Sequence, residues 1–389
     1  MDSELQDILS LAATPPQAHP FWVDGEAPVL IYGTGTVGQD VHHLLTAKGV
    51  QVDGFVDHFR TEVPSLRGTA VFQPDDARLP PEVRSRSAII LAIHNREANT
   101  VLIVDRLRGI GYQHIVSLVD VDDNFPDELG DRYWLTNRRY YQAHESAIAS
   151  ALEVLADEVS RSLYLAVLRF RTTGDPSVLP APDRDHQYVP TDIPAWEDPL
   201  RLIDCGAYDG DTLRALLHSG RAIQALAAFE PDPSNFSRLC RFVDDRHEDL
   251  AETYLWPCAV DSTTHQVLFG HNQGETSSIS PTGEAVVQAV ALDDVLFGFS
   301  PNLVKLDVEG AEQAALHGAR NLIATTRPGL AICVYHRPSD LWEVPLLIER
   351  LAMGTQTRSR SDYQYFLRLH GYSTFDLVLY AVPEPRRAS

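Results

Sequence analysis

The chain has 389 residues, with 54 Asp and Glu against 32 Lys and Arg, and its formal net charge at pH 7 is −22. This length exceeds what one hydrophobic core usually organises, so we expect two domains. Nucleic acids and anionic membranes select basic surfaces. The acidic charge therefore argues against both as partners and favours a small molecule.

The cysteines are few and widely spaced, at Cys205, Cys240, Cys258 and Cys333. Such spacing is typical of reduced, buried thiols, and the lack of a close Cys/His pair argues against a zinc site. No stretch approaches the roughly 20 apolar residues that span a bilayer, and the acidic N-terminus lacks the basic and apolar regions of a signal peptide. We expect a cytoplasmic protein.

Residues 28–125 predict a first α/β domain, after a leader of residues 1–27 that shows no assignable element. Apolar strand segments alternate here with helical stretches, which is typical of a parallel, Rossmann-like sheet. The predicted strands are 29–32, 52–57, 88–93 and 114–118.

The turn after the first strand, Gly33 to Gly38, has the G-x-G-x-x-G spacing of a dinucleotide site, and Asp57 follows about twenty residues later. The motif alone is weakly specific. Three interpretations stay open: a site for a nucleotide sugar or other substrate, a docking module without a ligand, and an NAD(P) site with redox chemistry.

Residues 126–199 predict a helical connector and a linker. Within residues 131–170, Leu152, Leu155, Val159 and Leu163 recur at near-helical spacing. Six prolines then fall between Pro176 and Pro199, which favours a linker or an extended surface segment. We place the domain boundary there.

Residues 200–389 restart the alternation of strands and helices and predict a second, mostly parallel sheet that ends in an antiparallel hairpin. The predicted strands are 201–205, 225–229, 252–257, 265–270, 285–291, 302–307 and 329–335, with the hairpin at 363–366 and 376–382.

The turn after the first of these strands reads Asp204-Cys205-Gly206-Ala207-Tyr208-Asp209-Gly210, and Glu230 ends the next strand. This pattern favours a nucleoside pocket in which the acid accepts the ribose hydroxyls. It lacks the G-x-G-x-x-G turn that binds a pyrophosphate, so the predicted ligand is a nucleoside without phosphates, which S-adenosylmethionine satisfies. We predict cofactor contacts at Asp204, Gly206, Gly210 and Glu230.

Asp261, after Cys258-Ala259-Val260, is a further candidate for the cofactor site. At the end of the third strand it could accept a hydrogen bond from the adenine amino group. An acid followed by Ser262-Thr263-Thr264 is also an ordinary hairpin turn, so both interpretations stay open.

Transfer of the S-adenosylmethionine methyl group also requires removal of the acceptor's proton if the acceptor is a hydroxyl. Asp307 ends an apolar strand, Glu309 follows it, and His336 ends the next strand, so we expect all three at one sheet edge. Two mechanisms remain open. Either His336 or Asp307 is the general base of a metal-free transfer, or Asp307, Glu309 and His336 bind a divalent cation.

The C-terminal half resembles the FkbM family of S-adenosylmethionine-dependent methyltransferases over residues 200–383. Cys205 departs slightly, at a position where a valine-like residue is usual. The resemblance rests on an ordered set of motifs, which are Asp204–Thr212, Phe229–Phe236, Cys258–Asp261, Leu292–Asp294, Lys305–Glu312, Tyr335-His336, Ser339–Trp342 and Leu379–Pro383.

The resemblance implies a class I methyltransferase fold for the second of two Rossmann-like domains. It also implies O-methylation of a sugar, glycoside or related hydroxyl. The alternatives are an NAD(P)- or nucleotide-sugar-binding oxidoreductase or bifunctional enzyme that uses the N-terminal domain, and a non-catalytic binding protein. The sequence predicts no oligomeric state.

Overall fold

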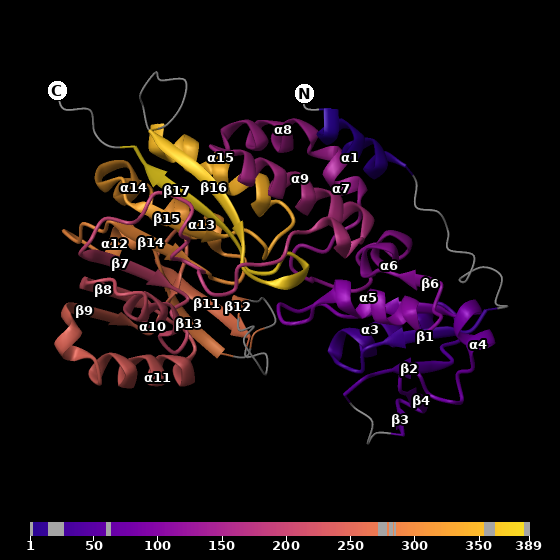
Figure 1. The fold of residues 1–389 in the computed structure, drawn as a ribbon. Helices are drawn as coiled ribbons and strands as arrows, with labels where there is room; N and C mark the ends of the chain where they lie inside the picture. The colour runs from indigo at the N-terminus through magenta and orange to yellow at the C-terminus, as the bar shows by residue number, and fades with distance from the viewer. Residues whose placement is uncertain are drawn as a thin grey trace. The chain divides into compact units, whose positions relative to one another are not determined.

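The computed structural model describes residues 3–14, 27–59, 64–270, 278–279, 283, 285–353 and 362–384 (Figure 1). The chain forms two compact units, and both are discontinuous in sequence. The N-terminal unit comprises residues 1–149, 163–182 and 371–375, and the C-terminal unit comprises residues 150–162, 183–370 and 376–389. The stretch expected to connect two domains is thus divided between the units.

Helix α1 (Ser3–Ala13) occupies a stretch that the sequence analysis left without an element. Its buried residues, Leu5, Ile8, Leu9 and Ala12, follow the spacing of one helix face. The helix packs against α7 (Arg139–Ala143) of the same unit. The first residues therefore contribute to the core of the N-terminal unit.

The sheet of the N-terminal unit has the strand order β3-β4-β2-β1-β5-β6. Neighbours from β4 to β6 pair in parallel, as predicted, and only β3 pairs antiparallel, with β4. The strands are β1 (Val29–Tyr32), β2 (Gly54–Val56), β3 (Ser65–Leu66), β4 (Thr69–Phe72), β5 (Ala88–Leu91) and β6 (His114–Val116). The helices are α3 (Thr36–Ala47), α4 (Pro81–Arg86), α5 (Thr100–Gly109) and α6 (Leu118–Asn124).

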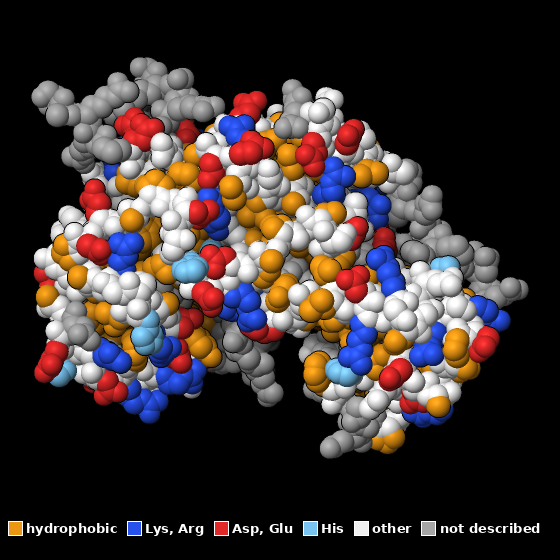
Figure 2. All heavy atoms as spheres, in the orientation of Figure 1, with side chains coloured by type: hydrophobic (Ala, Val, Ile, Leu, Met, Phe, Trp, Pro, Cys, Tyr) orange, Lys and Arg blue, Asp and Glu red, His pale blue; other side chains and the backbone are white. Residues whose placement is uncertain are grey.

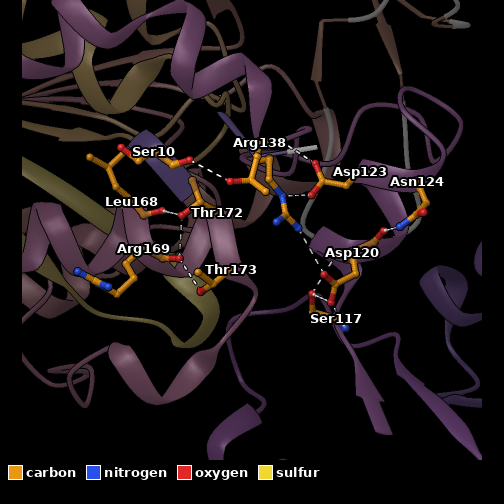
Figure 3. A network of polar contacts seen from close by, with 11 residues as sticks. Ser10, Ser117, Asp120, Asp123, Asn124, Arg138, Leu168, Arg169, Thr172 and Thr173 are labelled. Atoms are coloured by element: carbon orange, nitrogen blue, oxygen red, sulfur yellow. Dashed lines mark hydrogen bonds and ion pairs between the residues drawn. The ribbon is translucent and has the colours of Figure 1, made fainter. Parts of the chain in front are cut away.

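Arg138 joins α6 to the start of α7 (Figure 3). Its side chain pairs with Asp123 and lies 3.4 Å from Asp120 Oδ1, and its backbone N–H donates to Asp123 Oδ1 at 2.8 Å. Asp120 also closes a capping box with Ser117 at the start of α6. These charge-assisted bonds fix the segment that follows the parallel sheet.

The helical region predicted for residues 131–170 begins at Arg139 and is divided into separate helices. After α7 come α8 (Glu145–Val154) and α9 (Glu158–Thr173). Between them Asp157 accepts the Ser160 N–H at 2.8 Å, an N-cap that starts a new helix. Leu155 leaves the helical pattern to bridge Tyr365, and Val159 is 55% exposed, so neither belongs to a continuous helix face.

The main sheet of the C-terminal unit has the strand order β16-β17-β15-β14-β7-β8-β9. Strands β9, β8, β7, β14 and β15 run parallel, and β17 pairs antiparallel with both β15 and β16, which confirms the predicted hairpin. The strands are β7 (Leu200–Cys205), β8 (Ile223–Phe229), β9 (Leu250–Trp256), β14 (Leu303–Leu306), β15 (Gly329–Cys333), β16 (Tyr363–Leu369) and β17 (Leu377–Pro383).

The helices of this unit include α10 (Asp211–His218), α11 (Pro233–Asp244), α12 (Leu292–Val295), α13 (Glu312–Gly318), α14 (Arg320–Thr326) and α15 (Asp340–Met353). A second sheet has the order β10-β13-β11-β12 and contains β10 (Ala259–Val260), β11 (His265–Gly270), β12 (Ser278–Ile279) and β13 (Ala285–Val290). The predicted strands 265–270 and 285–291 thus form outside the main sheet.

The Pro-rich residues 183–199 belong to the C-terminal unit, and we call them the 183–199 segment. Tyr188, Ile193 and Trp196 within it are buried. Trp196 Nε1–H donates to the Tyr188 carbonyl at 2.8 Å. The segment packs on the unit through these side chains, which is closer to the extended surface segment than to the linker among the two interpretations of the sequence.

The cysteines and the charged surface have the following features. The four cysteines are free, and Cys205, Cys258 and Cys333 are buried. On the face drawn in Figure 2, acidic and basic side chains are interspersed. Among the described helices, none combines the length and the apolar character that a bilayer crossing requires.

Candidate active site

The turn that follows β7 depends on two glycines in the left-handed region. Gly206 has φ +74°, and a Cβ there would lie 1.9 Å from the Asp307 carbonyl oxygen. Gly210 has φ +91°, and its Cβ would lie 2.7 Å from the Phe242 ring. A side chain at either position would clash. The Gly206 turn is therefore packed directly against the end of β14.

Glu230 follows β8 and faces this turn. Its Oε2 accepts the Tyr208 N–H at 2.9 Å, and its Oε1 accepts the Asp232 N–H at 2.8 Å. The residue is 6% exposed, and burial raises the pKa of its carboxyl to about 7 despite these hydrogen bonds. The structure thus brings the predicted ribose acceptor to the predicted turn.

Asp204 and Lys305 are cross-strand partners on β7 and β14. Lys305 Nζ lies 3.1 Å from Asp204 Oδ1 and donates to the Gly206 carbonyl at 2.6 Å, and both side chains are buried. Burial raises the pKa of Asp204 to about 6, although the positive charge of Lys305 acts to lower it. Burial alone would lower the pKa of Lys305, but nearby carboxylates, Asp204 first, raise it. The pair holds the Gly206 turn from within the sheet.

His336 follows β15 and is surrounded by three carboxylates. Its Nδ1 lies 2.7 Å from Glu312 Oε1, and its Nε2 lies 3.4 Å from Asp307 Oδ1 and 3.7 Å from Glu309 Oε2. Burial would lower the pKa of His336, but Glu312 and then Glu309 raise it to about 10. The structure thus brings together Asp307, Glu309 and His336, as predicted.

Glu312, the first residue of α13, also belongs to this cluster. It is fully buried, and its Oε1 also accepts the Val308 N–H at 2.9 Å. A sequence pattern does not distinguish a buried acid at a helix start from the common exposed one. Asp307, Glu312 and His336 each offer a ligand atom within 4.8 Å of the others.

Tyr188, in the 183–199 segment, is a second member that the sequence did not reveal. Its Oη–H donates to Asp307 Oδ2 at 3.0 Å. Burial alone would raise the pKa of Asp307, but Lys305 and then His336 lower it below its usual value. Asp307 is therefore an ionised carboxylate with one oxygen toward Tyr188 and the other toward His336.

Asp261 lies elsewhere in the unit than the sequence analysis expected. It follows β10 of the second sheet, whereas the third strand of the main sheet, β9, ends at Trp256. Its Oδ1 accepts the Ser262 Oγ–H at 3.1 Å, and its Oδ2 lies 3.8 Å from His265 Nε2. These are the local contacts of a turn, although β10 and β11 on either side of it each pair with β13 and not with one another. The contact of Asp261 with adenine stays a prediction.

In the N-terminal unit, Asp57 is bound to the glycine turn itself. Its Oδ2 accepts the N–H and hydroxyl of Thr34 at 3.0 and 2.6 Å, and its Oδ1 accepts the Phe59 N–H at 2.8 Å. A small pocket lies beside the ends of β5 and β6, lined in part by Ile93, His94, Ser117, Trp134 and Phe170. All three interpretations of this unit stay open.

The sheet order of the C-terminal unit, with β17 as an inserted antiparallel strand and a glycine turn facing an acid, defines a class I methyltransferase fold. Residues 204–372 match the methyltransferase FkbM domain. The chain thus carries an FkbM methyltransferase domain in its C-terminal half, and the protein is an S-adenosylmethionine-dependent methyltransferase.

The fold of the whole chain is similar to a crystal structure of the methyltransferase FkbM from Methylobacillus flagellatus KT, with a TM-score of 0.76 at 20% identity. The match covers 97% of this chain and 99% of that chain. At this identity the likeness establishes the fold. A comparison with curated proteins gives no match.

Proposed function

We propose that this protein transfers the S-adenosylmethionine methyl group to a hydroxyl of a sugar or related polyol. One observation carries the proposal: the Gly206 turn abuts the Asp307 backbone, so the expected cofactor turn adjoins the Asp307–His336 cluster. Glu230 and the turn would hold the nucleoside. The cluster would receive the acceptor beside the sulfonium.

A hydroxyl acceptor fits the chemistry of the cluster. In the in-line displacement, the acceptor oxygen forms a bond to the methyl carbon while the carbon–sulfur bond breaks, and the hydroxyl proton must leave. Asp307, whose lowered pKa keeps it ionised, would accept that proton. His336, whose pKa of about 10 keeps its imidazole protonated without a cation, would orient Asp307 and the acceptor. Carboxylates are also good acceptors for the hydroxyl groups of a polyol.

The cluster also fits a divalent cation. His336 Nε2 faces Asp307 and Glu309, whereas Nδ1 faces Glu312. We assign His336, Asp307 and Glu309 as the ligands. Glu312 is then the carboxylate that orients the imidazole, a common arrangement around ligating histidines. When bound, the cation would lower the pKa of the acceptor hydroxyl.

The proposal is tested by methyl-transfer assays with a panel of sugars and glycosides, using the wild type, Asp307→Asn and His336→Ala. We expect both variants to bind S-adenosylhomocysteine normally and to lose turnover by a factor of about 100 or more. Glu252→Ala, an exposed carboxylate of the same unit, is the matched control and should retain turnover. Unchanged turnover in both cluster variants would remove their assigned role.

A further inference from the structure

We propose that Tyr188 is a positioning residue for methyl transfer and that the 183–199 segment holds it in place to orient the Asp307 carboxylate. This inference rests on the proposed role of Asp307. The sequence interval that resembles a linker would then contribute directly to the organisation of the active site.

The backbone of Tyr188 is fixed on both sides in an uncommon conformation. Its φ is +67°, in the left-handed region that non-glycine residues rarely adopt. Its N–H donates to Tyr380 Oη at 3.0 Å, and its carbonyl accepts from Trp196 Nε1 at 2.8 Å. A strained conformation persists only where the surroundings determine it, and such residues concentrate at functional sites.

A chain of hydrogen bonds supports this conformation. His370 Nδ1 lies 2.6 Å from the Asp183 carbonyl, and its Nε2 lies 2.8 Å from Tyr380 Oη. A carbonyl only accepts, so Nδ1 is the donor, and in the neutral imidazole Nε2 accepts from Tyr380. Burial lowers the pKa of His370, which favours this neutral form. Tyr380 Oη remains free to accept the Tyr188 N–H.

The phenol of Tyr188 can act on Asp307 in one way only. The ionised Asp307 carboxylate can only accept a hydrogen bond, so the phenol hydroxyl is the donor. It donates to Asp307 Oδ2 at 3.0 Å, while Asp307 Oδ1 lies 3.4 Å from His336 Nε2. Because one oxygen is bound to Tyr188, the carboxylate presents the other toward His336.

Tyr188→Phe tests the proposal because it removes the hydroxyl and keeps the ring. We expect unchanged S-adenosylhomocysteine affinity, an acceptor KM within about twofold of the wild type, and a kcat lowered about tenfold, the scale of one hydrogen bond to a charged group. Tyr363→Phe is the matched control, since it removes a buried phenol that donates to the Pro328 carbonyl at 2.7 Å. Its kcat should match the wild type.

The second measurement is a double-mutant cycle with Asp307→Asn. If Tyr188 acts through Asp307, Tyr188→Phe should lower kcat no further in that background. A wild-type kcat for Tyr188→Phe, or the same fold loss in both backgrounds, would overturn the inference. Should Asp307→Asn itself keep full turnover, the proposed function of Asp307 fails instead, so the two failures are distinguishable.

Discussion

His336 Nδ1 lies 2.7 Å from Glu312 Oε1, and both side chains are buried. The histidine follows β15, and the glutamate begins α13. A carboxylate on one imidazole nitrogen fixes the ring's orientation and leaves the other nitrogen directed at the substrate or a cation. This pair determines how the cluster presents His336 Nε2.

Glu312→Gln should lower turnover about 10- to 100-fold while leaving S-adenosylhomocysteine affinity unchanged, because the amide keeps the volume but loses the charge beside the imidazole. Steady-state kinetics and calorimetry provide the two readings. Glu343→Gln, at the start of α15, is a control with the same chemistry. Equal kcat in Glu312→Gln and the wild type would rule out an orienting role.

Removal of divalent cations should abolish turnover if Asp307, Glu309 and His336 are ligands. We expect protein dialysed against a chelator to be inactive and to recover on addition of Mg²⁺ or Mn²⁺. Glu309→Gln should require a higher cation concentration for half-maximal recovery. Full activity in chelator would establish the metal-free mechanism.

Lys305→Met should lower the free energy of unfolding by about 3–5 kcal/mol, because it leaves the buried Asp204 without its counter-charge. Denaturant titration measures the loss. Asp204→Asn in the Lys305→Met background removes the orphaned charge and should restore part of the stability. If the double variant is no more stable than Lys305→Met, the unpaired Asp204 charge is not the cause of the lost stability.

Glu230 should make stability depend on pH in a defined direction. Burial raises its pKa from 4.5 in the unfolded chain to about 7 in the folded protein, so the folded state holds the extra proton between these values. Its stabilising contribution is fully present below 4.5 and is lost as the pH rises through 7. Relative to Glu230→Gln, the wild type should lose about 2–3 kcal/mol of unfolding free energy between about pH 5 and pH 8. A pH-independent difference would contradict the buried, proton-binding state of this carboxyl.

Much of the site was predictable because parallel strands place their carboxyl ends at one sheet edge. From that rule we expected Glu230 near the Gly206 turn and His336 near Asp307, and both pairs lie close together. Apolar runs in the sequence predicted most strands of the main sheet. Glu312 could not be predicted, because its role depends on its burial. Tyr188 could not be predicted either, because its role depends on a contact with Asp307, which is far from it in sequence. The division into discontinuous units was equally hidden, because local patterns do not report which unit a helix packs against.

Calorimetric titration with S-adenosylhomocysteine tests the central claim most directly, using the wild type and Glu230→Ala, with NAD titrated in parallel. The account predicts that the wild type binds S-adenosylhomocysteine and that Glu230→Ala weakens this binding at least about tenfold, because the variant loses charge-assisted hydrogen bonds to the ribose. Equal affinity in the two proteins would contradict the assigned cofactor site. Binding of NAD with none of S-adenosylhomocysteine would contradict the account as a whole.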